Sequence, residues 1–526
     1  MLKKAFLTNS SGILCSRVFG FLRDLSMANI LGAGIYSDIF FVAFKFPNLF
    51  RRIFGEGAFT QSFLPNFIAS SKKGAFSVLI LAIFSLILIA LSLLVVAFSG
   101  AFTRLLVFGF DEYLIELAKP IVAIHFWYLL LVFWVTFFSA LLQYKQHFWV
   151  SAYNTALLNI AMIGALLLAR DKDEMQIVYF VSYGVLVGGA AQVCLHFYPL
   201  YRLGFLRLLA CGVGEVRLAF VGGKARGESR LESKKAESGA ESKAKSSADS
   251  GAKSELESKN TAQNAESNFA KSRRLAATIK SELATFFKKF FPAMLGSSTA
   301  QIASFIDTLL ASFLASGSIS YLYYANRIFQ LPLAIFAIAI STALFPMVAK
   351  AIKAGEEQKA LAAMKRSFWF LLAMLSLCAV GGIMLSQQII WLLYEHGKFA
   401  RADTIETALV FCAYMVGLVP FGCARIFSLY LYSQNAQARA AKISAISLGV
   451  GVVFSLIFMQ FWGAVGLALA GSLSGFVLFW LTISSFGLNR FWDIMRAKKY
   501  AIYASLAVAA EVCILTAWLY LVEIPN

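Results

Sequence analysis

Long apolar segments, each about 20 residues, recur along almost the whole chain and constrain its fold more than any other feature. A helix of about 20 residues, at about 1.5 Å per residue, crosses the roughly 30 Å hydrocarbon core of a bilayer. Only 14% of the 526 residues are charged, whereas a soluble domain carries about 25%. The sequence therefore predicts an all-α polytopic membrane protein.

The positions of the apolar windows predict thirteen transmembrane helices. They lie near 8–31, 34–54, 75–100, 119–143, 149–169, 176–200, 287–315, 318–349, 368–394, 405–432, 440–461, 463–487 and 500–522. Under this count every strongly basic connection falls on one side, and the acidic connections at 111–116 and 171–174 fall on the other. Positive charge marks the cytoplasmic side, so we expect a cytoplasmic N-terminus and a periplasmic C-terminus.

The net charge of +19 belongs to these connections rather than to one basic surface, so we expect no nucleic-acid partner. The seven Cys are scattered without a CxxC pair, and the four His share no ligand spacing. Neither a disulfide framework nor a metal or other cofactor is therefore predicted. No nucleophile–base pair or acidic metal motif occurs in a loop, and an enzyme is not indicated.

A polar segment from about 222 to 275, rich in Ser, Ala, Lys and Glu, divides the chain into two apolar halves. Because it lacks apolar periodicity, it is typical of a disordered cytoplasmic linker. The expected domains are an N-terminal lobe at 1–200, a cytoplasmic loop at 201–286, a C-terminal lobe at 287–487 and a further helix at 488–526.

The two halves show a weak internal similarity. Asp24 lies in the first helix of one half and Asp307 in the first helix of the other, and the helix after each contains one Pro, Pro47 or Pro332. This ordering favours two parallel repeats in a V around a central site. The alternative is a chance likeness between Gly- and Pro-rich membrane helices.

The segment 16–67 places many charges inside two predicted spans. These charges are Arg17, Arg23, Asp24, Asp38, Lys45, Arg51 and Arg52. Each costs about 2.5–3.5 kcal/mol at the centre of a membrane helix, so the side chains must face a wet cavity or one another. Positions seven apart share a helical face, which predicts one stripe of Arg17 with Asp24 and another of Asp38, Lys45 and Arg52.

Two further arginines interrupt apolar spans of the second half, Arg327 in "YYANRIFQLP" and Arg425 in "VPFGCARIFSLYLY". Guanidinium groups keep their charge and present a planar fork of donors that suits phosphate and carboxylate oxygens. A cavity lined in this way prefers a multiply anionic ligand. The alternative, strongest for Arg51, Arg52 and Glu56, is that these side chains snorkel to the cytoplasmic interface.

Several words of the sequence closely resemble the MurJ (MviN) family of lipid II flippases, within the MATE-like exporter superfamily. They are "SRVFGFLRD", "SDIFFVAFKFPNLFRRIFGEGAF", "QSFLP", "SFLASGSISYLYYANRIFQLP", "LFP" and "HGKF". The resemblance implies two lobes around a central cationic cavity. It also implies alternating access that carries lipid II across the bacterial inner membrane for cell-wall synthesis. Membrane lipids, and cell-wall synthesis proteins as further partners, fit the same picture.

Matched by motif, the family's essential or substrate-contacting positions and their neighbours fall on nine residues of this chain. The expected substrate-binding residues are Arg17, Arg23, Asp38, Asn48, Arg51, Arg52, Glu56, Arg327 and Arg425. Two acids, Asp24 and Asp307, are candidates for binding an ion or for energy coupling.

Three departures from the family pattern qualify these expectations. The last family helix is absent from our count. Asn326 stands where the family usually has an acid, which leaves Arg327 without that partner. The span 440–461 contains no Asp, Glu or Asn, which puts coupling to sodium in doubt.

Other functions remain open on the residues alone. The cavity would also suit an exporter of another lipid-linked oligosaccharide, whereas a drug exporter for hydrophobic cations is poorly served by buried positive charge. A membrane glycosyl- or phosphotransferase should show acidic metal ligands or a catalytic acid in a loop. A silent scaffold would not require charges inside the spans.

Overall fold

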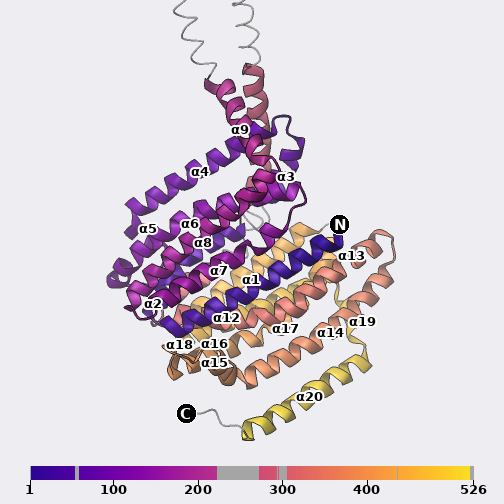
Figure 1. The fold of residues 1–526 in the computed structure, drawn as a ribbon. Helices are drawn as coiled ribbons and strands as arrows, with labels where there is room; N and C mark the ends of the chain where they lie inside the picture. The colour runs from indigo at the N-terminus through magenta and orange to yellow at the C-terminus, as the bar shows by residue number, and fades with distance from the viewer. Residues whose placement is uncertain are drawn as a thin grey trace, which may run out of the picture.

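The computed structural model describes residues 2–53, 59–221, 272–292, 294, 305–434 and 436–521. Within these ranges the regular secondary structure is helical, without strands. Nine helical segments of this part of the chain are long and apolar enough to cross a membrane. Figure 1 shows these helices as one bundle with a helical projection at one end. The predicted all-α polytopic class is confirmed.

The helices of the first half run from α1 to η2. They are α1 (Leu2–Leu31), α2 (Ile35–Ile53), α3 (Phe59–Ala69), α4 (Lys73–Ala97), α5 (Ser99–Leu106), α6 (Glu112–Tyr144), α7 (Trp149–Ala169), α8 (Glu174–Arg202), α9 (Phe205–Val216) and the π-helical η2 (Arg217–Val221). The most deeply buried of them is α6, whose Phe133, Phe137 and Leu141 are fully covered by neighbouring helices. Against this core, α1 packs on α7 and α7 packs on α8.

The second half begins with helical residues at 305–311 and continues from α12 to α20. The elements are α12 (Ser318–Pro332), the π-helical η3 (Leu333–Ile338), α13 (Ala339–Lys353), α14 (Glu357–Met384), α15 (Ser386–Tyr394), α16 (Arg401–Val416), α17 (Leu418–Ser433), α18 (Gln437–Phe486), α19 (Leu488–Met495) and α20 (Lys498–Leu521). Figure 1 shows α20 at the edge of the bundle, alongside α14.

The count of thirteen spans stays a prediction, and three features explain why it differs from the nine apolar segments. The expected span 287–315 is described only in part, because residues 293 and 295–304 lie outside the described residues. The expected spans 440–461 and 463–487 both lie in α18, which turns at Gly463 with φ 52° and ψ −127°. A backbone at positive φ is easily adopted only by glycine, so a single residue separates the two helices there. The helices α1 and α2 hold the charged segment and are not among the nine.

The projection in Figure 1 consists of α9 with η2 and the helical residues 272–292. Two carboxylates attach it to the start of α4. Glu282 accepts hydrogen bonds from the Ser70 hydroxyl at 2.7 Å and from the Ser71 amide at 3.0 Å, and Glu215 pairs with Lys72 at 3.2 Å. Anionic groups are favourable at a helix N-terminus, where amides lack partners.

Of the expected linker at about 222–275, residues 222–271 lie outside the described residues.

Aromatic packing continues from the projection into the first lobe. The ring of Phe286 lies 6.1 Å from Phe59, and the ring of Phe290 lies 5.4 Å from Phe84. The chain entering the second half therefore first packs against α3 and α4. By residues 305–311 it has reached the boundary between the two halves, where a charged cavity lies.

Close backbone contact between α4 and α9 yields a stability prediction. A Cβ at Gly212 would lie 2.3 Å from the carbonyl carbon and oxygen of Gly74, whereas a Cβ at Gly214 meets nothing within 4 Å. Overpacking of this kind costs about 1–3 kcal/mol. We expect Gly212→Ala to lower the melting temperature of the purified protein by about 2 °C or more.

The matched control is Gly214→Ala on the same helix. There the change from glycine improves helix propensity by about 1 kcal/mol and creates no clash, so the melting temperature should stay the same or rise. Equal behaviour of the two variants would contradict the proposed close contact.

Candidate functional site

A cavity of about 460 Å³ lies between α1, α2 and α7 of the first half and residues 305–311, α12 and α16 of the second. Its lining is unusually charged for a bundle of membrane helices. Among the described residues that line it, the charged ones are Arg17, Arg23, Lys45, Arg51, Arg327 and Asp307. The cavity therefore carries an excess of positive charge.

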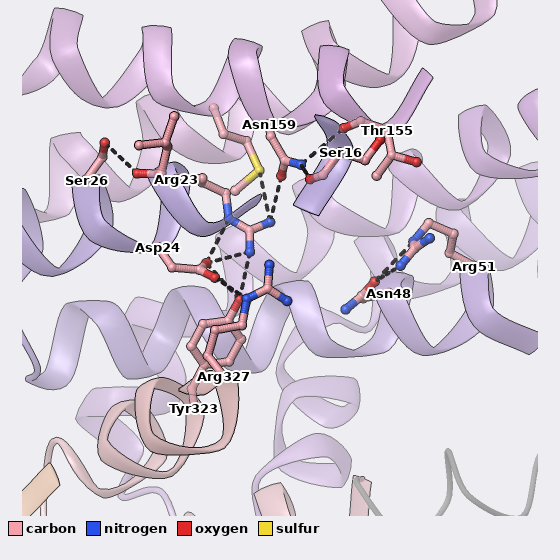
Figure 2. Close-up of polar contacts among 12 residues, drawn as sticks. Ser16, Arg23, Asp24, Ser26, Asn48, Arg51, Thr155, Asn159, Tyr323 and Arg327 are labelled. Atoms are coloured by element: carbon pink, nitrogen blue, oxygen red, sulfur yellow. Dashed lines mark hydrogen bonds and ion pairs between the residues drawn. The ribbon is translucent and has the colours of Figure 1, made fainter. Parts of the chain in front are cut away.

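At the wall of the cavity, the Asp24 carboxylate is bound by arginines from both halves of the chain (Figure 2). Arg23 donates from Nη2 to Asp24 Oδ1 at 2.6 Å, and Arg327 Nε lies 2.6 Å from Asp24 Oδ2. Tyr323 accepts from Arg23 at 2.8 Å and donates to Asp24 at 3.1 Å. On the other side, Arg23 Nη1 donates to Asn159 Oδ1 at 3.1 Å. We call these five residues the Asp24 cluster.

The first-half charges of the Asp24 cluster are deeply buried, since Asp24 is 0% and Arg23 8% exposed, whereas Arg327 is partly open to the cavity. One carboxylate between two guanidiniums leaves a net charge of +1. Removing the carboxylate would leave two arginines without compensation, a change that costs about 3–5 kcal/mol for buried pairs. Arg327 thus finds its acid in Asp24, on another helix, although Asn326 precedes it in the sequence.

Beside this cluster, Asp38 of α2 caps the start of α12. Its oxygens accept from the Gly317 amide at 2.7 Å, from the Ser320 amide at 2.8 Å and from the Ser320 hydroxyl at 2.5 Å. The first amides of a helix have no partner within the helix, and their end of the helix dipole attracts negative charge. Asp38 is only 4% exposed, so water cannot easily replace it.

Further bonds close the same end of the cavity. The Lys398 amide donates to the carbonyl of Asn29 at 2.8 Å, and its ammonium pairs with Glu174 at 3.0 Å. The Tyr324 hydroxyl donates to the carbonyl of Gly32 at 3.3 Å. These contacts, together with those of Asp38, hold the C-terminal end of α1 and the N-terminal ends of α2 and α8 against α12 and the turn before α16. We call them the interlobe latch.

The remaining predicted site residues differ in their positions. Arg17 lines the cavity with an exposed side chain and makes no hydrogen bond or ion pair to another described residue. Arg51, also in the lining, donates to Asn48 at 3.0 and 3.1 Å (Figure 2). Arg425 is exposed on α17 and is absent from the described lining. Two predicted members, the Arg52 side chain and Glu56, lie outside the described residues.

Sequence reasoning did not single out several polar neighbours of the predicted residues. Asn159 and Tyr323 complete the Asp24 cluster, and Gln330 and Tyr414 line the second-half wall. Asn159 could have been found from the sequence, because it is a polar residue inside the apolar span 149–169. Burying an amide is costly unless it is hydrogen-bonded, so such a residue indicates a polar partner in the interior. Within the described part of the chain, no group of three metal-binding side chains is present.

The charged interlobe cavity can be compared with known proteins. The family model described as "Lipid II flippase MurJ" matches residues 27–525. The chain belongs to the MurJ family. A relative from Helicobacter pylori strain 26695, named "Probable lipid II flippase MurJ", is 49% identical over 492 residues, which cover 94% of this chain and 96% of that protein. A relative with the same name from Helicobacter pylori strain J99 is 50% identical over the same length.

Solved structures support the fold of this MurJ family member. A structure titled "Lipid II flippase MurJ, inward closed conformation" superimposes with a TM-score of 0.70 at 22% identity and covers 98% of this chain and 99% of its own. An inward-facing multidrug MATE family transporter superimposes with a TM-score of 0.59 at 14% identity, over 94% of this chain and 99% of its own. The predicted MATE-like architecture is therefore confirmed.

The interlobe latch leads to a prediction for hydrogen exchange. Asp38→Ala removes the acceptor of the Gly317 and Ser320 amides, which then have no intrahelical partner at the start of α12. We expect deuterium uptake of a peptide covering residues 313–322 to be faster by about tenfold or more, as for the loss of a hydrogen bond to a charged group.

Asp403→Ala is the control for this measurement. Asp403 lies near the same end, but it accepts from Ala400 and Tyr321, within the second half. Its loss should leave the exchange of Gly317 and Ser320 unchanged. Unchanged exchange in Asp38→Ala would contradict the capping role of Asp38.

Proposed function

We propose that this protein flips lipid II, the lipid-linked peptidoglycan precursor, from the cytoplasmic to the periplasmic leaflet of the bacterial inner membrane. The cationic cavity between the two halves is the observation that carries the proposal. Membership of the MurJ family and the names of the Helicobacter pylori relatives support the choice of substrate. The protein acts as a transporter in this proposal, without a catalytic residue.

The lining explains how an anionic headgroup would be held. Arg17 is exposed to the cavity, and Lys45 and Arg51 lie on the same wall. Guanidinium groups bind pyrophosphate and carboxylate oxygens through paired hydrogen bonds, which are strong in a partly dehydrated site. The polyprenyl tail, being apolar, stays in the membrane while the headgroup passes through the cavity.

The Asp24 cluster suggests how binding is linked to movement. Arg23 and Arg327 come from different halves and share one carboxylate. Phosphate oxygens in the cavity offer the same guanidiniums a second set of acceptors, so a bound headgroup weakens their dependence on Asp24. A ligand shifts a conformational equilibrium only if it binds one conformation more tightly than the other. The replacement of Asp24 by phosphate oxygens around the two guanidiniums is a contact that can differ between the two conformations.

The interlobe latch is the gate that must open for release. We assign it to the periplasmic end, because the basic connections predicted to be cytoplasmic, such as Lys72 and Lys73, lie at the opposite end of the first lobe with the projection. The cytoplasmic N-terminus and periplasmic C-terminus follow from the same assignment. In this proposal the structure is a state closed toward the periplasm, and alternating access requires Asp38 to leave α12.

Depletion in the native cell tests the function. After depletion, an added enzyme that cleaves lipid II only from the periplasmic side should find less lipid II, while total lipid II rises because transport is blocked. Unchanged accessibility would refute the proposal and favour export of another lipid-linked oligosaccharide.

Arg17→Ala tests the cationic cavity. The variant loses an exposed guanidinium of the lining, and we expect transport of lipid II in proteoliposomes to fall by about tenfold or more. Because Arg17 makes no bond to another described residue, the amount of inserted protein and its melting temperature should not change.

Arg104→Ala is the matched control for charge. Arg104 pairs with Glu112 at 2.6 Å on the surface, and such exposed pairs contribute little. Its transport rate should equal that of the wild type. Full transport by Arg17→Ala would contradict the assigned role of the cavity cations.

A further inference from the structure

One acid, Asp307, faces a cavity whose other charged lining residues, among those described, are all cations. It lies in the helical residues 305–311, its side chain is exposed, and it forms no hydrogen bond or ion pair with another described residue. Asp24 and Asp38 differ from it because arginines or helix amides occupy their oxygens. The carboxylate of Asp307 is therefore open to a ligand.

The two halves of the chain line the cavity with different residues. Arg17, Lys45 and Arg51 belong to the wall formed by α1 and α2. The second-half wall contains Asp307 with several neutral hydrogen-bonding residues, and its one cation among the described residues, Arg327, is bound to Asp24. The neutral residues include Thr308, Asn326, Gln330 and Tyr414. A ligand that fits both the cations and Asp307 carries negative as well as positive charge.

A role as a counter-ion within the protein explains Asp307 less well. Lys45 of α2 acts on it electrostatically, but the two side chains do not form an ion pair. A sodium site is not favoured either, because the span 440–461 contains no Asp, Glu or Asn that could supply a second ligand. An unpaired carboxylate at membrane depth is costly unless a partner enters the cavity.

We propose that Asp307 binds a primary ammonium group in the peptide part of the transported precursor. This inference rests on the proposed function, since it names the part of the headgroup that reaches the second-half wall. The peptide of a lipid-linked peptidoglycan precursor contains a diamino acid whose side-chain amine has this chemistry. A carboxylate and an ammonium form a charge-assisted hydrogen bond, so the cavity selects zwitterionic over purely anionic headgroups.

The test compares two synthetic precursors in proteoliposomes containing the full chain. Both are lipid-linked disaccharide pentapeptides; one has a free side-chain amine, and the other has that amine acetylated. Transport is followed with an added cleaving enzyme. We expect the wild type to carry the free-amine compound about tenfold faster, and a monomethylated amine, which is larger but still charged, to behave like the free amine.

The variants separate recognition from general damage. Asp307→Asn should slow only the free-amine compound, which brings the ratio of the two rates close to one, and Asp307→Glu should retain the preference. Glu511→Gln is the matched carboxylate control, because Glu511 lies in α20 next to Gly381 of α14, outside the cavity lining. Its ratio should equal that of the wild type.

Three results would overturn the inference. Equal rates for the two compounds in the wild type would exclude ammonium recognition and leave the proposed function intact. An equal loss for both compounds in Asp307→Asn would point to a structural or coupling role. Failure of the wild type to carry either compound would remove the proposed function itself, and the inference with it.

Discussion

The shared carboxylate of Asp24 is the interaction on which the rest of the site depends. Arg23 approaches it from the same helix and Arg327 from the other half of the chain, so one buried acid joins the two lobes. Its burial makes the carboxylate necessary, because Arg23 without it would be an uncompensated charge away from bulk water. The positions of α1 and α12 are thereby fixed relative to each other, and with them the shape of the cavity between them.

Buried ion pairs contribute little net stability compared with well-packed apolar groups, but they are well suited to joining elements that must later separate. The Asp24 cluster and the latch at Asp38 follow this logic with different chemistry. In the first, two guanidiniums surround a carboxylate; in the second, the unpaired amides of α12 do so. Both sets of donors can bind other anions or water once the lobes move apart. Neither interaction therefore holds the protein permanently in one conformation.

The sequence predicts the membrane fold and the general position of the cavity because the bilayer penalises charge so strongly. Arg17, Arg51 and Arg327 could be assigned to a wet interior for that reason, and they line the cavity. The same argument does not predict whether Arg425 faces the cavity or another surface, and in the structure Arg425 is exposed on α17 and does not line the cavity. Contacts such as Tyr323 with Asp24, 299 residues apart, depend on how two distant helices are placed, and helical periodicity within one segment contains no information on that placement.

Three aspartates around the cavity have different roles because their carboxylates have different neighbours. Asp24 is held by guanidiniums and fixes the lobes; Asp38 is held by peptide amides and closes one end; Asp307 has neither and faces the cavity. The oxygens of the first two are occupied by donors within the protein. The third faces the cavity cations without a hydrogen bond or ion pair to another described residue, and an ammonium group on the ligand would supply the partner that the protein does not.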